Sequence, residues 1–398
     1  MKILFHFTHK QTFGHTTRSF SFAKALADRG AEVLILQGGV PQPFILNPAG
    51  CKVVDIPFPF DNRDSFQSLI KSTASAQRSE FILNTAKNFS PDVFITEFFP
   101  FGRLDYTPEL IETLRYLSKK GSRIIASIGY PLITDLDKFD NQRFASFKKA
   151  LFAFFNTFLI HTPPELENKY FEQTIQSSTL SSLYSSLMDK LKKRTVYTGY
   201  IFPEKLITGG TTSPPTPSSN TIIVSRGGGS VYPKVIASAI KAQRELEKKF
   251  HTTIACGPAT SPKEKKFFQT QLKPEDNDRV FLTDYLNNLH DYFHTCRLSI
   301  SLSGYNTSVQ LMRYGTPSII IPYQSKNLKN LTNDQIARSQ LLKEKFSSII
   351  LDCHTLTTKS LVTAIKEQLS RPRPDPAPAD WFNGADVAAR LIVQDTLN

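Results

Sequence analysis

The chain has 398 residues, of which 40% are hydrophobic and 21% are charged. This length and composition exclude a small stapled scaffold and global disorder, because two or three apolar cores can form. The 48 lysines and arginines exceed the 35 acidic residues, and the resulting net charge of +13 favours anionic partners.

Cysteine spacing and hydropathy indicate the cellular compartment. Cys51, Cys256, Cys296 and Cys353 lie far apart, without the spacing of a disulfide framework or a zinc site. The apolar start of the chain is too short for a signal sequence, and the apolar stretch 150–160 is too short to cross a bilayer. We therefore expect a cytoplasmic protein.

Short β-rich runs alternate with longer helical patterns over residues 1–202, which is typical of βα units that build a parallel sheet. The runs predict strands at 3–7, 32–37, 52–56, 93–96, 123–127 and 157–161, and helices at 17–29, 66–87 and 108–120. Gly30 and Gly121 follow two of these helices as stop signals. We expect an amino-terminal Rossmann-like domain over residues 1–202.

Residues 203–220 are rich in small and polar residues and proline, and are expected to form a linker. The alternation then restarts and predicts strands at 221–225, 253–255, 280–283, 298–301, 318–321 and 348–351. These strands indicate a second Rossmann-like domain over 221–372. Residues 373–398 hold a proline-rich connector and a terminal helix, which we expect to pack back on the first domain. Ligands of such sheets bind beyond the carboxyl ends of the strands, so a cleft between the domains is the expected site.

The loop after the first strand reads HKQTFGHTTR, residues 9–18. Gly14 allows a tight turn, and the helix start that follows attracts a phosphate or carboxylate. His15 would then lie at the mouth of the cleft. In the alternative interpretation, Gly14 is only a turn and His15 is a surface or capping residue.

Glycine turns recur in the second half. The three glycines of VSRGGGS, residues 224–230, let backbone amides approach a pyrophosphate, with Arg226 and Ser230 as further donors. No Gly-Lys-Ser/Thr follows, and a purely structural turn remains the alternative. In SLSGYNTSVQ, residues 301–310, Gly304 makes the turn before a helix, and in NDQIARSQ, residues 333–340, two polar residues share one helix face. These polar helix starts predict a pocket for a nucleotide diphosphate.

At this point the sequence resembles a known family. SGYNTSVQLMRYGTPSIIIPY followed by NDQIARSQLL resembles the donor-binding signature of family-28-type glycosyltransferases, the group that contains the peptidoglycan-precursor N-acetylglucosaminyltransferase. GHTTR is similar to their glycine-histidine acceptor loop. TEFFPFGR, LIHTPP and YTGY are similar to a bacterial branch of predicted glycosyltransferases. The resemblance extends to about Leu351 and implies an α/β protein with the GT-B fold, in which two Rossmann-like domains face each other across a cleft.

The resemblance implies that a sugar is transferred from a nucleotide diphosphate to a hydroxyl with inversion. The implied diphosphate ligands are Gly228, Gly229, Ser230, Ser303, Gly304, Tyr305, Asn306 and Thr307, besides Arg226. The backbone of Asp284, Tyr285 and Leu286 would meet the base, Gln335 would face the sugar and Arg338 would support its helix. Gly14, Arg18 and Arg103 would line the acceptor side. Gln310 stands where relatives commonly place a glutamate on the donor ribose, so uridine is only the default nucleotide.

A base must take the proton of the acceptor hydroxyl, and His15 is the first candidate because imidazole exchanges protons near neutral pH. Glu97 is the alternative. It follows a strand and adjoins the aromatic run 98–101, where desolvation is expected to raise its pKa. Glu97 equally fits a structural ion pair with Arg103.

No metal or other cofactor is expected besides the nucleotide-sugar co-substrate. Asp135 and Asp137 form an Asp-x-Asp, but a single such tripeptide arises by chance and is interpreted as a solvated turn. Backbone amides and helix amino termini can stabilise a departing diphosphate without a metal.

Two other function classes stay open. A sugar-nucleotide epimerase or hydrolase can use the same two-domain architecture, and loss of catalysis would leave a nucleotide-sugar-binding protein. The acceptor is expected to be a small molecule or a lipid-linked molecule, and the positive charge would suit peripheral contact with the inner face of a membrane. Nucleic acid is not an expected partner, because no dense basic run interleaved with aromatics occurs.

Overall fold

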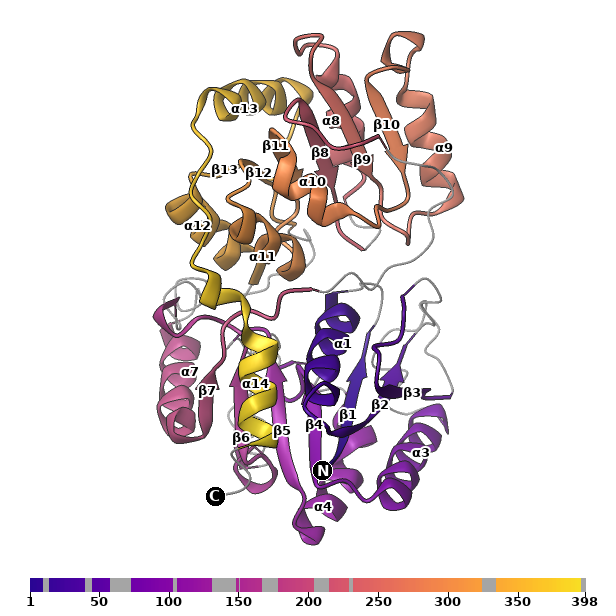
Figure 1. The fold of residues 1–398 in the computed structure, drawn as a ribbon, viewed down its shortest axis with the longest axis vertical. Helices are drawn as coiled ribbons and strands as arrows, with labels where there is room; N and C mark the ends of the chain where they lie inside the picture. Colours follow the sequence, from indigo (N-terminus) through magenta and orange to yellow (C-terminus); the bar gives the residue numbers. More distant parts are fainter. Residues whose placement is uncertain are drawn as a thin grey trace.

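The structure is a computed structural model that describes residues 1–9, 14–39, 45–57, 73–102, 106–130, 148–149, 151–166, 178–203, 215–228, 232–323 and 334–394. Its described part contains two α/β domains, one above the other in Figure 1, each built on its own parallel sheet. The α/β class expected from the sequence is confirmed.

The first domain holds a seven-stranded sheet in the order β3-β2-β1-β4-β5-β6-β7. Its strands are β1 (Lys2–Thr8), β2 (Glu32–Gly38), β3 (Cys51–Asp55), β4 (Val93–Glu97), β5 (Arg123–Ile128), β6 (Thr157–Ile160) and β7 (Thr195–Tyr197). The central strands are buried on both faces, which explains why their sequences are continuous apolar runs. The short edge strand β7 was not expected, because only three residues pair there.

Helices connect the strands of the first domain. They are α1 (Gly14–Ala27), α3 (Thr73–Phe89), α4 (Thr107–Lys120) and α7 (Ser178–Leu191). Gly121 ends α4 with a positive φ of 81°, as the sequence predicted for a glycine stop. The start of the helix expected at 66–87 lies outside the described residues, and α3 begins at Thr73.

The second domain holds a six-stranded parallel sheet in the order β10-β9-β8-β11-β12-β13. Its strands are β8 (Thr221–Ser225), β9 (His251–Ala255), β10 (Val280–Thr283), β11 (Leu298–Ser301), β12 (Ser318–Ile320) and β13 (Ile349–Ile350). Its helices are α8 (Lys234–Gln243), α9 (Pro262–Gln271), α10 (Leu289–Thr295), α11 (Tyr305–Tyr314), α12 (Asp334–Phe346) and α13 (Thr358–Ser370). Every strand expected in this half is present.

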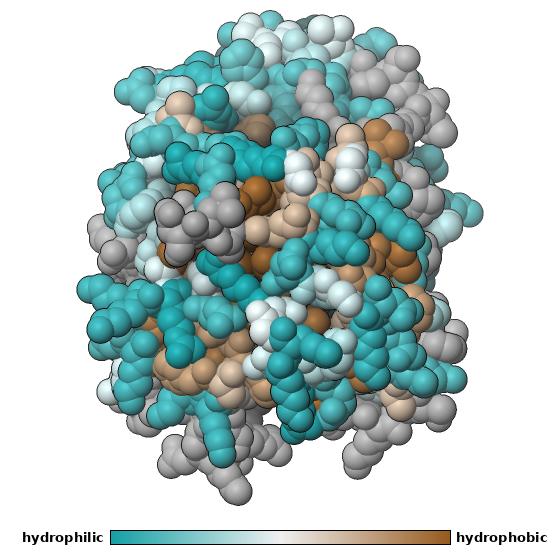
Figure 2. All heavy atoms as spheres, turned by 60° about the horizontal axis from the view of Figure 1, so that its bottom comes forward, coloured by the Kyte–Doolittle hydropathy of each residue, from teal (hydrophilic) through white to brown (hydrophobic). Residues whose placement is uncertain are grey.

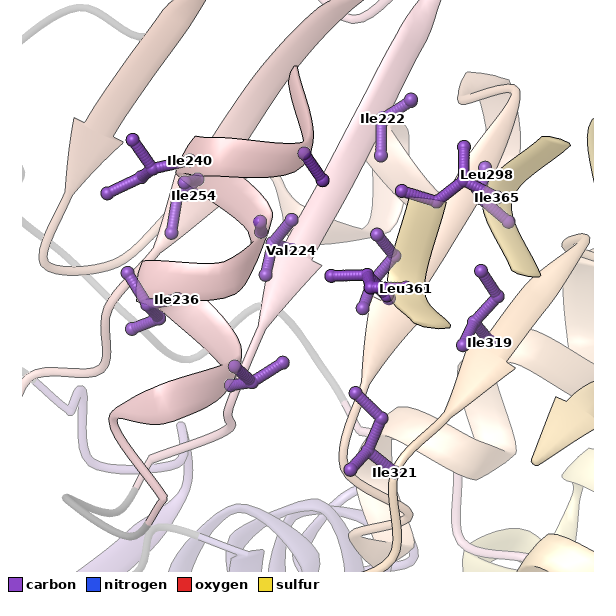
Figure 3. Packing of buried hydrophobic residues seen from close by; sticks show 14 of the residues in the cluster. Ile222, Val224, Ile236, Ile240, Ile254, Leu298, Ile319, Ile321, Leu361 and Ile365 are labelled. Carbon is purple, nitrogen blue, oxygen red and sulfur yellow. The ribbon is translucent and has the colours of Figure 1, made fainter. Parts of the chain in front are cut away.

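The core of the second domain lies between its sheet and two helices (Figure 3). Ile236 and Ile240 of α8 and Leu361 and Ile365 of α13 are buried against apolar residues of β8, β9, β11 and β12, among them Val224. Burial of each such side chain contributes about 1.5–3 kcal/mol relative to its exposure. This packing holds the strands and helices in place and so positions the turn after each strand. The helices whose first residues are polar begin at these turns.

The chain returns to the first domain at its end. After α13 it passes down to a final helix, α14 (Gly384–Val393), which lies beside α1 in Figure 1. Ala388, Ala389 and Ile392 of α14 share one buried cluster with Phe20 and Phe22 of α1. Among the described residues, none of the helices combines the length and the apolar character that crossing a membrane requires.

Candidate active site

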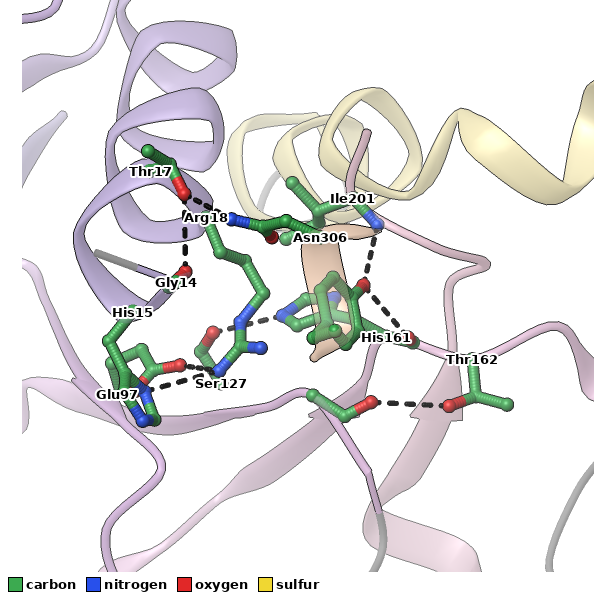
Figure 4. Close-up of polar contacts among 12 residues, drawn as sticks. Gly14, His15, Thr17, Arg18, Glu97, Ser127, His161, Thr162, Ile201 and Asn306 are labelled. Atoms are coloured by element: carbon green, nitrogen blue, oxygen red, sulfur yellow. Dashed lines mark hydrogen bonds and ion pairs between the residues drawn. The ribbon is translucent and has the colours of Figure 1, made fainter. Parts of the chain in front are cut away.

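The candidate site lies where the carboxyl ends of both sheets approach each other. His15 is in the first turn of α1, and Glu97 is the last residue of β4. His15 Nδ1 and Glu97 Oε2 are 2.8 Å apart, so the imidazole donates to the carboxylate (Figure 4). Glu97 therefore orients the ring and leaves Nε2 as the nitrogen that can accept a proton.

Arg18 completes this contact from the next turn of α1. Its Nη2 donates to Glu97 Oε1 and lies 3.5 Å from His15 Nδ1. The side chains of Arg18 and Glu97 are 6% and 2% exposed, so this ion pair is buried. The three residues form one His15–Glu97–Arg18 cluster.

The pKa of Glu97 was expected to rise, and this expectation is wrong. Burial alone would raise the pKa of Glu97, but Arg18 and His15 outweigh burial and lower it to about 2. Glu97 is therefore an ionised partner of His15 at neutral pH and is unsuited to be the base. The alternative pairing with Arg103 lies outside the described residues.

The second domain reaches this cluster through the start of α11. The guanidinium carbon of Arg18 lies 4.6 Å from the ring centre of Tyr305, within cation–π range. Asn306 Nδ2 donates to Thr17 Oγ1 at 2.5 Å, and a Cβ at Gly14 would lie 4.0 Å from the same nitrogen. The helix that was expected to bind the donor thus begins beside the first turn of α1, which carries His15.

A buried histidine that the sequence analysis assigned no role lies next to the cluster. His161 follows β6, and its ring nitrogens are 2.9 Å from Ser127 Oγ and 2.8 Å from Thr198 Oγ1. Burial, and then the charge of Arg18, lowers the pKa of His161 to about 3. The only signal for this residue was the LIHTPP motif.

The carbonyl of His161 also meets the second domain. Tyr305 Oη donates to His161 O at 3.2 Å and accepts from Ile201 N at 3.0 Å. The Tyr305 ring packs edge-on against those of Tyr130 and Tyr200, at centroid distances of 5.6 Å and 6.0 Å. Tyr305, expected only to bind the diphosphate, therefore also anchors α11 in the first domain.

The start of α11 has the features of an anion site. Gly304 caps the helix without a side-chain hydrogen bond, and a Cβ at Gly304 would meet nothing within 4 Å. The N–H groups of Tyr305, Asn306 and Thr307 lie in the first turn, where an α-helix offers them no partner of its own. These groups can bind a phosphate.

Residues of α12 support the turn before α11. Ser303 Oγ donates to Gln335 O at 2.7 Å, and Arg338 Nε donates to Ser303 O at 2.6 Å. Gln335 Oε1 accepts from Tyr323 N at 2.9 Å. Arg338 also pairs with Asp334 at 2.7 Å. The structure therefore brings Ser303, Gln335 and Arg338 together.

Among the residues that the structure describes, two buried amide oxygens beside this turn have no hydrogen-bond partner. They are Asn306 Oδ1 and Gln310 Oε1. Gln310 Nε2 donates to Asn306 O at 3.3 Å, so its amide is oriented by the helix itself. An unpaired buried acceptor costs about 1–3 kcal/mol, and a hydroxyl or amide of a ligand would satisfy it.

Arg226 is placed differently from expectation. Its three guanidinium nitrogens donate to Cys256 O at 2.5 Å, Glu264 Oε1 at 3.0 Å and Thr260 Oγ1 at 2.8 Å. Arg226 is 2% exposed. The side chain therefore anchors the turn after β8 to the β9–α9 segment, and its expected donation to a diphosphate stays a prediction.

The remaining expected ligands of the donor are spread along the same edge. Asp284 forms an ion pair with Lys265 at 2.6 Å. Tyr285 is half-buried, and the Leu286 side chain is part of an apolar cluster. Gly228 is half-buried after β8. Gly229, Ser230 and Arg103 lie outside the described residues, as do Asp135 and Asp137.

Within the described ranges, one group of side chains could hold a metal ion. Asp352, Cys353 and His354 place one ligand atom each within 4.8 Å of one another. They follow β13, the edge strand of the second sheet. Asp352 Oδ1 already accepts from His354 N at 2.6 Å, and Cys353 is buried.

Residues 221–387 match the family model of the glycosyltransferase family 28 C-terminal domain. No curated protein matches the chain in sequence. Among solved structures, the glycotransferase of kitacinnamycin superposes with a TM-score of 0.62 at 14% identity, covering 98% of both chains. MurG of Acinetobacter baumannii has a TM-score of 0.54 at 14% identity, covering 99% of this chain and 98% of its own.

The UDP-GlcNAc 2-epimerase of Methanocaldococcus jannaschii is also similar, with a TM-score of 0.57 at 10% identity and full coverage of both chains. At such identities these structures establish the fold, which is the GT-B arrangement expected from the sequence. The family model covers the second domain and the segment that follows it, and the solved structures cover the whole chain. The chain therefore has the GT-B fold, and its residues 221–387 match the glycosyltransferase family 28 C-terminal domain.

Proposed function

We propose that the protein transfers a sugar from a nucleotide-diphosphate donor to an acceptor hydroxyl with inversion, using His15 as the general base. The observation that carries this proposal is the 2.8 Å contact between His15 and Glu97 beside the first turn of α11. Glu97 holds the Nδ1 proton, so Nε2 of His15 accepts the proton of the hydroxyl while that oxygen attacks the anomeric carbon. Such proton transfer contributes about 10² to 10⁴ in rate.

The donor diphosphate is proposed to bind at the amino terminus of α11. The leaving diphosphate gains negative charge, and the first-turn N–H groups of Tyr305, Asn306 and Thr307 can stabilise that charge. Gly304 leaves space for the phosphate to approach. Gln310 and Gln335 are proposed to bind the ribose and the sugar. Uridine is the nucleotide to test first.

The reaction is proposed to need no metal, because helix and amide dipoles supply the charge stabilisation. Assays with a chelator test this directly. Undiminished turnover in EDTA is expected. Full dependence on added Mn²⁺ or Mg²⁺ would contradict the proposal.

A nucleotide panel gives the first experiment. A ligand at 100 times its dissociation constant adds about 2.7 kcal/mol to the free energy of unfolding, which a thermal-shift assay detects. We expect one nucleoside diphosphate and its sugar to raise the melting temperature, and His15→Ala to retain this binding while losing turnover. Binding by the wild type without transfer to any acceptor hydroxyl would favour an inactive nucleotide-sugar-binding protein.

An epimerase or hydrolase is the second candidate, supported by the similarity of the chain to the solved UDP-GlcNAc 2-epimerase. Incubation of the donor without an acceptor separates the two functions. A transferase leaves the sugar nucleotide intact, whereas an epimerase inverts a stereocentre and a hydrolase releases free sugar. Rapid conversion without an acceptor would overturn the transferase proposal.

We further propose that the acceptor is lipid-linked and that the protein binds it at an anionic membrane surface. Three helices of the first domain end in exposed lysines at the pole where its strands begin, opposite the second domain in Figure 1. These are Lys87, Lys119, Lys120, Lys190, Lys192 and Lys193. Figure 2, which brings this end forward, shows hydrophilic side chains over much of the face.

Each lysine near an anionic surface adds roughly 1 kcal/mol of attraction, and salt screens that attraction. The protein is expected to sediment with phosphatidylserine vesicles at low salt and to be released at high salt. Absence of binding at low salt would end the membrane proposal without affecting the proposed transfer reaction.

A further inference from the structure

The residue after Glu97 has an unusual backbone conformation. Among the described residues, four residues other than glycine have a left-handed backbone, and Phe98 is one of them, with a φ of 64°. Ser90 and Ser347 directly follow helices, where this conformation commonly ends the helix, and Tyr232 lies just before α8. Phe98 instead follows strand β4, and the conformation strains a residue as bulky as phenylalanine. The chain therefore keeps an unfavourable backbone at the point where it leaves Glu97.

Two hydrogen bonds hold this backbone in place. Phe98 N donates to Ser127 O at 2.8 Å, which continues the pairing of β4 with β5. Phe98 O accepts from Gly102 N at 2.9 Å. The sheet and the segment that follows thus fix the turn, and they fix the direction of the Phe98 side chain with it.

That direction brings the Phe98 ring against the imidazole of His15. The two ring centres are 5.5 Å apart, with 49° between the ring planes. Gly102 also borders the Phe98 ring, and a Cβ at Gly102 would lie 2.8 Å from Cδ1 and Cζ of Phe98 and closer still to Cε1. The backbone of Gly102 has no positive φ, so space for the ring, rather than conformation, requires glycine here.

His15 is therefore contacted in two different ways. Glu97 Oε2 accepts the hydrogen bond of His15 Nδ1, and the Phe98 ring packs against the imidazole. A hydrogen bond to one atom leaves the imidazole free to tilt, whereas an adjoining aromatic ring limits that tilt. The His15 side chain is 21% exposed, so packing does not enclose it on every side. The contact with Phe98 thus restricts a ring that could otherwise turn.

We propose that Phe98 is a positioning residue for the general base, and that its strained backbone is retained because it places the aromatic ring against His15. The ring holds the imidazole on Glu97, which keeps the proton on Nδ1 and directs Nε2 towards the acceptor hydroxyl. This inference rests on the proposed role of His15 as base.

The kinetics of Phe98→Ala and Phe98→Leu test this role. Loss of the ring in Phe98→Ala is expected to lower kcat about tenfold to hundredfold, because misplacement of a reacting group by about 1 Å can cost about 10²-fold in rate. Phe98→Leu keeps part of the apolar contact and is expected to lie between Phe98→Ala and the wild type. The KM for the donor is expected to stay within about twofold, because the proposed diphosphate site is in the second domain.

Phe99→Leu is the matched control. Phe99 is 6% exposed, and its ring packs against that of Phe155 with 6.1 Å between the ring centres. Because Phe99 is buried and Phe98 is half-buried, Phe99→Leu is expected to lose at least as much stability as Phe98→Leu while kcat stays near that of the wild type. An equal fall of kcat in the two leucine variants would show that Phe98 acts through stability alone, and would overturn the proposal.

A double variant separates a role through His15 from any other role. Phe98→Ala is expected to cause no further loss of kcat in a His15→Gln background, because residues that act through one another give non-additive losses. A further fall of the same size would overturn the proposal. Gly102→Ala displaces the Phe98 ring without removing it and is expected to lower kcat as well. It replaces Phe98→Ala in these comparisons if thermal unfolding shows that Phe98→Ala does not fold.

The strain is tested by stability. Glycine accepts a left-handed backbone and alanine does not, so Phe98→Gly is expected to melt at a higher temperature than Phe98→Ala. Glu112, exposed in α4, is the control position, where Glu112→Gly is expected to melt below Glu112→Ala. The same order at both positions would show that the Phe98 backbone is not strained and would overturn that part of the proposal.

NMR distinguishes failure of this inference from failure of the proposed function. The ¹⁵N shifts of the His15 imidazole at alkaline pH, assigned by their loss in His15→Gln, show which nitrogen carries the proton. We expect a proton on Nδ1 in the wild type and a mixture of both tautomers in Phe98→Ala. The same pattern in both proteins would overturn the role of Phe98 even if His15 is the base. If His15→Gln instead transfers sugar as fast as the wild type, His15 is not the base, and the NMR comparison still decides whether Phe98 positions the imidazole.

Discussion

Asn306 Nδ2 donates a hydrogen bond to Thr17 Oγ1, although 289 residues separate the two side chains in sequence. Asn306 is in the first turn of α11 and Thr17 is in the first turn of α1. The contact therefore joins the helix proposed to bind the diphosphate to the helix that carries His15. First-turn N–H groups have no partner within their own helix, so the contact places the proposed diphosphate site next to the proposed base.

Thr17→Val tests this contact, because valine keeps the shape of threonine and removes the acceptor of Asn306, together with the weak 3.3 Å hydrogen bond that Thr17 Oγ1 donates to Gly14 O. The lost hydrogen bond is worth about 1 kcal/mol, so kcat/KM for the donor is expected to fall about fivefold. Thr113→Val is the control, since Thr113 is buried in α4 of the same domain and its Oγ1 has no hydrogen-bond partner in the described part of the chain. Equal kcat/KM values in the two variants would show that the contact does not serve catalysis.

Glu97→Gln tests the orientation of His15. Glutamine keeps the size of the side chain but removes the charge that Arg18 and His15 bind, so the tautomer of His15 is no longer fixed. We expect kcat to fall about 10² to 10⁴-fold, as for loss of a general base, with donor affinity nearly unchanged. The readouts are steady-state kinetics and calorimetric donor binding.

A double variant tests whether His15 and Glu97 act together. Residues that act as one unit show non-additive losses, so His15→Ala with Glu97→Gln is expected to be no slower than His15→Ala alone. Additive losses would mean that Glu97 acts independently. If Glu97→Gln alone abolished turnover while His15→Ala kept it, the base would be Glu97 after all.

Much of the fold was predictable because buried parallel strands are continuous apolar runs, as in β1 and β8. The helical spacing of apolar residues also predicted α4, which ends at Gly121 as expected. The edge strand β7 was missed because three half-buried residues give no such pattern. The start of α11 was recognised from Gly304 and the polar residues that follow it.

The pairing within the site could not be predicted in the same way. His15 and Glu97 were each singled out, but they are 82 residues apart, and only the register of β1 beside β4 brings them together. The aromatic neighbours of Glu97 suggested a raised pKa, whereas the decisive cation, Arg18, comes from another element. The contacts of Arg226 with Cys256, Thr260 and Glu264 could not be predicted either, because sequence does not show which way a guanidinium points.

Two buried histidines make stability sensitive to mild acid. Burial lowers the pKa of both His6 and His161 to about 3, aided by Arg78 and Arg18 respectively. The unfolded chain, with histidine pKa values near 6.5, therefore binds more protons below that pH. The free energy of unfolding should fall as pH drops from 6.5 towards 3, by up to about 1.4 kcal/mol per pH unit for each histidine.

Denaturant unfolding between pH 6.5 and 5 measures this slope above the range in which Glu97 titrates. His161→Gln is expected to flatten it, while the exposed His251 provides the control variant His251→Gln. The absolute stability of His161→Gln can also fall, because Ser127 and Thr198 lose their ring partner, but the slope is independent of that loss. An unchanged slope in His161→Gln would show that the ring is protonated in the folded state.

Gly384→Ala tests the return of the chain to the first domain. Gly384 N donates to Tyr200 O at 3.0 Å, and a Cβ at Gly384 would lie 2.1 Å from Gly199 O. Because the obstacle is backbone, α14 must shift to accept a methyl group, and its buried Ala388, Ala389 and Ile392 must leave the cluster on α1. We expect a loss of more than about 2 kcal/mol in the free energy of unfolding and faster proteolysis near α14.

The control for this change is Gly30→Ala. Gly30 has a φ of 83°, and a Cβ there meets nothing within 4 Å, so the variant bears only the backbone strain of about 1 kcal/mol. It should lose less stability than Gly384→Ala and keep α14 resistant to protease. If the two variants instead have the same free energy of unfolding and α14 stays protected from protease in both, the close approach of Gly384 to Gly199 does not hold α14 against the first domain.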